Sequence, residues 1–307
     1  SGGTLSKAVS GSGTTNITGA VTSNSAISQA INIIAAGDLT ISAGNIGGAV
    51  TNAGDLILTG GTLSKVVSGA GLTTISGNTT NNGGINQAVK VNSGVTLANN
   101  AALGSANGAI TNAGTINSNA DYIKGTVANS GSLNLSGGTL SKAVSGSGTT
   151  NITGNTTNNA GINQGVNINN GVTLTNNAAL GSDSGKITNA GTINTNASNI
   201  KGTVTNNNAL NLSGGTLSKA VSGNGTTTIS GNTTNNAGIN QGVNVNNGVT
   251  LTNNAALGSD NGKITNAGTI NTNANNIKGA VTNNNALNLS GGTLSKAVSG
   301  SGTTNIT

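Results

Sequence analysis

The sequence predicts an all-β protein, a parallel β-helix (β-solenoid) with about 16 coils of ~19 residues each. Three observations support this prediction: an unusual composition, a long tandem repeat, and a shorter unit inside each repeat. The copies of the long repeat span residues 1–58, 59–135, 136–212 and 213–289, with a partial copy at 290–307. We therefore expect one continuous β-solenoid over residues 1–307.

The composition allows only a narrow hydrophobic core. The chain has no Pro, Cys, Met, Trp, Phe or His, and Tyr122 is its single aromatic residue. Apolar residues make up 33%, almost all of them Ala, Val, Ile and Leu, and 51 Gly accompany many Asn, Thr and Ser. β-Branched residues and turn formers favour strands joined by tight corners. The low charge content of 5% argues against disorder, which usually accompanies high net charge.

The charge and the hydrophobic pattern exclude two classes of partner. Eleven Lys against five Asp give a net charge of +6, which is too thinly spread for the basic stripe that nucleic-acid binding requires. No apolar run reaches the ~18 residues of a transmembrane helix, so we expect no membrane insertion in this segment.

The long repeat is recognised from one recurring motif. SGGTLSKAVSG begins at Ser136, Ser213 and Ser290, and the variant TGGTLSKVVSG begins at Thr59, so the four starts are evenly spaced. The first copy, which ends at Leu58, is shorter than the others. The missing length indicates a smaller unit of ~19 residues that can be lost as a whole.

The smaller unit is a short strand with an apolar centre. TTNITG, GVTLTN, GTINTN and ALNLSG share this form, and sixteen such centres follow one another along the chain: Ile17, Ile41, Leu58, Ile75, Leu97, Ile116, Leu135, Ile152, Leu174, Ile193, Leu212, Ile229, Leu251, Ile270, Leu289 and Ile306. Two further apolar stations precede each centre, which predicts about three strands per coil. A single coil cannot bury its apolar face, but stacking at ~4.8 Å pairs each strand with the coils above and below. Asn and Gly suit the corners because both tolerate left-handed backbone angles.

The chain begins and ends on the same phrase, SGGTLSKAVSGSGTTNIT, at residues 1–18 and 290–307. We expect these segments to be the same coil position in successive copies. Their apolar edges carry no cap, so we expect further coils of the same polypeptide, or abutting copies in a fibre, as partners.

Polar residues flanking the centres form the candidate binding surface, because the neighbours of an inward residue on a strand point outward. Two exposed ladders are predicted from the following residues: Asn151, Thr173, Thr192 and Asn211 before the centres, and Thr153, Thr175, Asn194 and Ser213 after them. These ladders either stabilise stacked coils through side-chain hydrogen bonds or form a flat docking face for glycans, a host surface, sister rods or ice.

The residues for catalysis or cofactor binding are missing. The carboxylates Asp38, Asp55, Asp121, Asp183 and Asp260 are scattered, and no Glu completes a pair for glycoside cleavage. Without His or Cys, no nucleophile is activated in the usual way and no metal cluster forms. We expect no enzyme activity, cofactor or metal. The repeated Lys65, Lys142, Lys219 and Lys296 recur once per copy, which avoids stacking like charges.

Units such as ITNAGTINTNA (187–197) and VTNNNALNLSGG (204–215) resemble the degenerate coils of filamentous haemagglutinin-like adhesins and autotransporter passenger domains of Gram-negative bacteria. The resemblance covers essentially the whole chain. It implies a right-handed β-helix, export to the cell surface, and a role as the stalk or fibre shaft of a large adhesin. No RGD tripeptide occurs and no secretion or barrel domain lies within these residues, so no functional residue carries over.

Overall fold

The computed structural model describes residues 2–307 and divides the chain into two compact units, Ser1–Asn151 and Ile152–Thr307. Both units are all-β and are built from parallel strands that stack turn upon turn. The predicted fold class is confirmed: the chain is a parallel β-solenoid of about 18 turns of ~17 residues.

The strands are short, and four 3-10 helical turns interrupt them. The strands that begin in the first unit are β1 (Gly3–Leu5), β2 (Thr14–Ile17), β3 (Ala20–Ser23), β4 (Ala30–Ile33), β5 (Asp38–Ile41), β6 (Val50–Asn52), β7 (Asp55–Leu58), β8 (Gly61–Leu63), β9 (Val67–Ile75), β10 (Thr79–Asn81), β11 (Ile85–Val91), β12 (Thr96–Asn99), β13 (Ile110–Asn112), β14 (Thr115–Ser118), β15 (Val127–Asn129), β16 (Ser132–Leu135), β17 (Gly138–Leu140) and β18 (Val144–Ile152). The strands of the second unit are β19 (Thr156–Asn158), β20 (Ile162–Ile168), β21 (Thr173–Asn176), β22 (Ile187–Asn189), β23 (Thr192–Thr195), β24 (Val204–Asn206), β25 (Ala209–Leu212), β26 (Gly215–Leu217), β27 (Val221–Ile229), β28 (Thr233–Asn235), β29 (Ile239–Val245), β30 (Thr250–Asn253), β31 (Ile264–Asn266), β32 (Thr269–Thr272), β33 (Val281–Asn283), β34 (Ala286–Leu289), β35 (Val298–Ser299) and β36 (Thr303–Ile306). The 3-10 turns are η1 (Ala43–Asn45), η2 (Ala120–Tyr122), η3 (Ala197–Asn199) and η4 (Ala274–Asn276).

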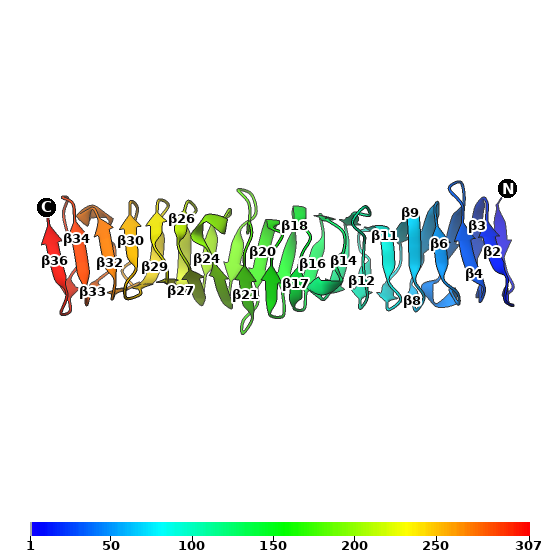
Figure 1. Cartoon of the computed structure of the whole chain (residues 1–307), viewed down its shortest axis with the longest axis horizontal. Coiled ribbons are helices and arrows are strands. Elements are labelled where there is room, and N and C mark those ends of the chain that lie inside the picture. The colour runs from blue at the N-terminus through cyan, green and yellow to red at the C-terminus, as the bar shows by residue number, and fades with distance from the viewer. Residues whose placement is uncertain (1) are drawn as a thin grey trace. The chain divides into compact units, whose positions relative to one another are not determined.

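Within each unit, the strands of one turn pair in parallel with those of the next, as Figure 1 shows for neighbouring arrows. A turn has three sides. In the first unit β6, β7 and β8 occupy successive sides, and each joins a different ladder of strands. Turn length varies because the corner loops differ. Thr14 pairs with Ala30 across a short turn, whereas Val89 pairs with Ile110 across a longer one.

The long repeat is not a whole number of turns, which corrects the expected coil length of ~19 residues. From β8 onward, one ladder of the first unit runs through Gly61, Thr79, Leu97, Ile116 and Leu133, which is four complete turns. The residue equivalent to Gly61 in the next copy is Gly138, which lies past Leu133 and begins the next side.

The second unit repeats this pattern, because four turns lead from Gly215 to Leu287 before the next copy begins at Ser290. One copy is therefore four turns plus one side. This extra side explains why the structure has more turns than expected, and why each turn is shorter.

The core is a narrow set of aliphatic columns. Ile, Leu and Val side chains in these columns are at most a few per cent exposed, and many are completely buried. In the second unit one column runs through Leu174, Ile193 and Leu210. Stacking removes both apolar and backbone polar groups from water together, which a single coil cannot do. The predicted narrow aliphatic core is confirmed.

The corners depend on glycine for backbone conformation and not on asparagine, which corrects the sequence interpretation. Every residue from 2 to 307 with a positive φ is a glycine. Gly171 has φ +73° with nothing near its missing Cβ, so only its backbone angle requires glycine. Gly191 is required for close approach, since a Cβ there would lie 2.2 Å from the carbonyl oxygen of Val172. Asparagine instead supports the corners with its side-chain amide.

Candidate functional site

The eight predicted ladder residues all lie on the outer surface, half-buried or exposed. In the second unit, Thr175 of β21, Asn194 of β23 and Asn211 of β25 stack directly on one another. Asn211 donates a side-chain hydrogen bond of 2.7 Å to Asn194. We call these three residues the outer ladder. In this part of the chain the strand pairing therefore brings Thr and Asn side chains into one row on the outer surface.

The membership of the two predicted ladders needs a correction. The sequence pattern predicts that Asn211 aligns with Thr173 and Thr192, and Ser213 with Thr175 and Asn194. The structure stacks Ala209 on Thr192 instead, and Asn211 on Asn194. Ser213 therefore lies beyond the ladder. The cause is that this turn is shorter than the expected unit of ~19 residues.

The two remaining predicted residues lie at the junction in sequence between the units. Asn151 is half-buried, and its side-chain amide donates to Ser132 Oγ at 3.1 Å and to Asn134 Oδ1 at 2.7 Å. It thus continues the outer stack of its own unit. Thr153 is exposed and follows the end of β18.

Buried amide ladders were not predicted. Asn176 is 1% exposed, accepts from Asn158 at 2.7 Å and donates to Thr195 at 2.9 Å. The next copy repeats the arrangement with Asn235, Asn253 and Thr272. Because buried polar groups require partners, these ladders hold the corners of successive turns together. The sequence signal was present, since TTN makes up β19 and β28, but an inward Asn was not expected.

A corner groove appears twice in the second unit, at the same position of two successive repeat copies. The first groove has a volume of about 410 Å³ and the second about 450 Å³. Residues that line the first include Asn177, Asn194, Asn196, Asn199, Asn211 and Ser213, and their equivalents line the second. The turn η3 forms one margin, capped by Asn196, whose side chain accepts a hydrogen bond from the backbone N–H of Ser198. The lining carries no charged or aromatic side chain.

The two corner grooves lie on neighbouring sides of the solenoid. The first follows the ladder of β21, β23 and β25, and the second follows that of β30, β32 and β34. This placement results from the extra side in each copy. The same polar surface is therefore presented in successive directions within one unit.

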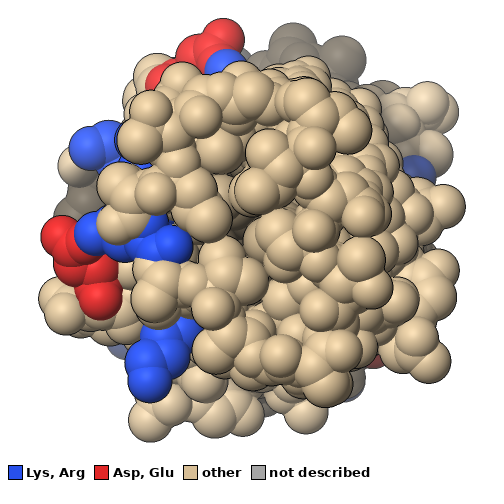
Figure 2. Space-filling view, turned by 90° about the vertical axis from the view of Figure 1, so that its left-hand side faces the viewer, with Lys and Arg blue, Asp and Glu red and all other residues tan. Residues whose placement is uncertain are grey.

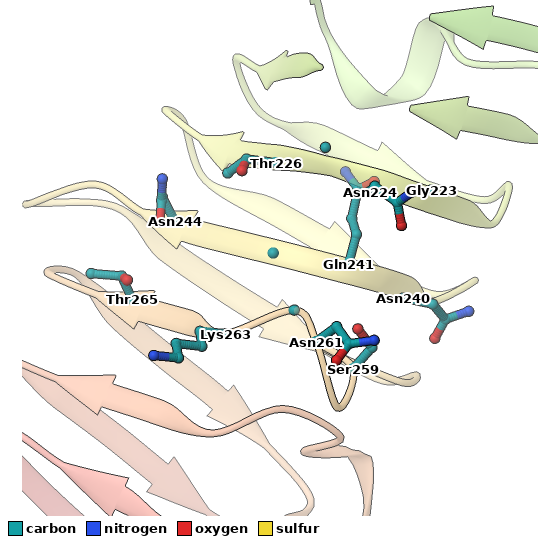
Figure 3. Close-up of a pocket in the computed structure, with 13 residues that line it drawn as sticks. Gly223, Asn224, Thr226, Asn240, Gln241, Asn244, Ser259, Asn261, Lys263 and Thr265 are labelled. Atoms are coloured by element: carbon teal, nitrogen blue, oxygen red, sulfur yellow. The ribbon is translucent and has the colours of Figure 1, made fainter. Parts of the chain in front are cut away.

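A larger side groove of about 660 Å³ lies elsewhere in the second unit (Figure 3). Ser259 and Asn261 stand on a loop at one end, and Asn244 and Thr265 lie at the other, toward which Lys263 points. The loop is closed by two backbone hydrogen bonds between Ser259 and Gly262. This groove differs from the corner grooves by its lysine.

Charged side chains are few, and most of those visible in Figure 2 lie on its left-hand side. Lys219 forms an ion pair with Asp183, and Lys296 forms the equivalent pair with Asp260. The hydrogen bond and the positive charge of Lys219 lower the pKa of Asp183 below its ordinary value, and Lys296 acts likewise on the pKa of Asp260. Both carboxylates are highly exposed on corner loops, so these pairs contribute little to stability.

The sequence predicts scattered carboxylates, but two of them lie side by side in the structure. Asp38 of β5 stacks directly on Asp55 of β7, and both are exposed. Their Cα atoms are therefore about one strand spacing, ~4.8 Å, apart. Neighbouring like charges on adjacent strands repel, so this pair weakens the stack.

Comparisons with protein families, curated proteins and solved structures find no match for this chain. No helix among residues 2–307 is long and apolar enough to span a membrane. The same residues contain no group of three or more His, Cys, Asp or Glu arranged to hold a metal ion.

Proposed function

We propose that the chain is a segment of the stalk or fibre shaft of a large, secreted, adhesin-like protein on a bacterial cell surface. The observation that carries the proposal is the stacking itself, since every turn in a unit pairs through parallel ladders with the next. Added turns extend such a structure along its axis without changing its cross-section. This is the property that a spacer requires.

The surface chemistry supports a structural role. Outer asparagines form hydrogen bonds along the stack, as between Asn211 and Asn194, instead of converging on one point. Two of the five carboxylates are paired with lysines, and the adjacent Asp38 and Asp55 are open to water. Catalytic carboxyl groups usually lie in a cleft, where burial shifts their pKa. None of these four carboxyl groups is buried in a cleft. We infer that this segment is not an enzyme and needs no cofactor.

We propose an extracellular location in a Gram-negative bacterium, with further turns of the same polypeptide or abutting copies as partners. The resemblance of ITNAGTINTNA (187–197) and similar units to secreted β-helix coils supports this location. The thin positive charge supports neither a nucleic acid nor a membrane as partner.

Deletion of one whole copy tests the shaft. Removal of residues 213–289 joins Leu212 to Ser290, which is the same junction that Leu212 makes with Ser213. The variant should stay folded, and its maximum dimension in small-angle X-ray scattering should fall by about 20 Å, from ~4.8 Å per turn. The cross-sectional radius of gyration should not change.

A display experiment tests the role directly. The chain is placed between a surface anchor and a peptide tag on bacterial cells, and a flexible Gly/Ser linker of equal length serves as control. The tag should bind a bulky antibody on the solenoid better than on the linker, and less well after the deletion. Equal antibody binding by all three would contradict the proposal.

A further inference from the structure

The corner groove contains amide groups that the protein leaves without a partner. Asn199 in the first groove and Asn276 in the second are half-buried, and within residues 2–307 neither side chain makes a hydrogen bond to the protein. Asn194 uses its side-chain oxygen to accept from Asn211, and its amide N–H groups remain free. Partly buried amides without partners are costly unless water or a ligand supplies the hydrogen bonds.

The copy that spans residues 59–135 carries a different residue at this position. Asn199 occupies the place that Tyr122, the only aromatic residue of the chain, has in that copy. Tyr122 ends the turn η2 as Asn199 ends η3, and it is 39% exposed. The outer asparagines recur there too, with Asn134 donating to Asn117 at 2.6 Å. An exposed aromatic ring beside a polar amide stack has both an apolar surface and hydrogen-bonding groups.

We propose that this corner of the three copies spanning residues 59–289 is a binding site for a neutral saccharide chain. A side-chain amide has a donor and an acceptor side by side, which matches two neighbouring sugar hydroxyls. The ring of Tyr122 supplies the flat apolar surface that the C–H face of a sugar ring requires, and its hydroxyl adds a hydrogen bond. The groove linings in the two following copies contain no charge, so an anionic sugar gains nothing there.

The arrangement of the copies determines how such sites act together. Because one copy is four turns plus one side, the grooves of successive copies in the second unit face different directions. A flat partner reaches one of them at a time, whereas a flexible saccharide chain reaches several by winding around. This inference is independent of the shaft function, which the solenoid performs with or without a ligand.

Tyr122 makes the experiment specific, because a chain with one Tyr and no Trp reports its fluorescence from a single position. The intact protein is titrated with neutral oligosaccharides of glucose, mannose and galactose up to millimolar concentration, and binding is measured in parallel by calorimetry. A heparin oligosaccharide serves as the anionic control. We expect a saturable change of tyrosine emission with at least one neutral sugar and none with heparin.

Variants taken from the sibling copies test the location. Tyr122→Asn inserts the residue that the two following copies carry, and Asn199→Tyr introduces the ring in the next copy, so both should fold with unchanged melting curves. The aromatic contribution predicts that the affinity of the affected site changes by about 2- to 10-fold, downward for Tyr122→Asn and upward for Asn199→Tyr. Absence of neutral-sugar binding, binding of heparin alone, or affinities that neither variant changes would each overturn the proposal.

Discussion

Two neighbouring asparagines at the end of β21 allow the packing of the solenoid to be tested with one residue type. Asn176 points inward and is 1% exposed. Its side-chain oxygen accepts from Asn158 at 2.7 Å, and its amide donates to Thr195 Oγ1 at 2.9 Å and to the carbonyl oxygen of Ala178 at 2.6 Å. Asn177 follows it on the outside and is exposed.

Asn176→Ala should destabilise the protein strongly. The change removes three hydrogen bonds and leaves the amide of Asn158 with one long contact of 3.5 Å, to the carbonyl oxygen of Ala179. The carbonyl oxygen of Ala178 also loses its side-chain donor. The buried amide of Asn158 and the partly buried carbonyl oxygen of Ala178 cost ~1–3 kcal/mol each without good partners, so we expect the free energy of unfolding to fall by about 2–6 kcal/mol.

Asn177→Ala is the matched control. Its amide makes one exposed hydrogen bond, of 2.8 Å to Asn159, so the expected change is within about 0.5 kcal/mol. Urea unfolding followed by far-ultraviolet circular dichroism measures both variants, and amide exchange of β21 shows whether the loss is local. Equal effects of the two substitutions, or a larger effect of Asn177→Ala, would refute the inward and outward assignment.

Deletions and charge changes test the turns and the ion pairs. Deletion of residues 175–193 removes one whole turn, because Leu174 then takes the place of Ile193, and circular dichroism should show a folded β protein; deletion of 175–184 breaks the columns and should lower the melting temperature sharply. Asp55→Asn should raise the free energy of unfolding by about 0.2–1 kcal/mol at low salt and by less at high salt, because it removes a stacked like charge. The pKa of Asp183 is lowered in the folded state, so its ion pair stabilises above the ordinary carboxyl pKa and is lost as pH falls through the lowered pKa. Carboxyl chemical shifts in NMR should show this lowered titration, and a normal titration would contradict the ion pair.

The sequence predicted the fold class because the solenoid pattern depends on few residue types. Apolar residues two apart between glycine and asparagine corners determine the strands, and the outward position of their neighbours follows from strand geometry. Thr175 and Asn194 pair on the outer surface, where this alternation places them. The same pattern could not determine the length of each turn. Leu210 and Leu212 are both fully buried, and either one serves equally well as the apolar centre in ALNL, so only strand pairing resolves the choice between them.

The role of asparagine could not be predicted from the sequence either. An asparagine at a corner either adopts a left-handed backbone or donates its amide to the next turn, and both explanations fit the same letters. The structure shows the second, since Asn158 and Asn176 are joined through their side chains and no residue other than glycine has a positive φ among residues 2–307. The pairing partner lies a full turn away, where local sequence gives no information.

The extra side in each copy has a consequence for a protein made of nearly identical repeats. Identical strands that stack on one another also fit when they slip, so a repeat equal to whole turns would allow many registers. Here Leu217 of β26 stacks on Asn235 of β28, and the next copy of the same sequence begins on a different side. A strand that slipped by one copy would meet the same sequence, but that sequence would lie on the neighbouring side of the solenoid. The same sequence returns to the same side of the solenoid only after three copies, because each copy adds one of the three sides to its four turns. The mismatch between repeat and turn therefore favours one register, and within the second unit it turns the same corner groove in successive directions.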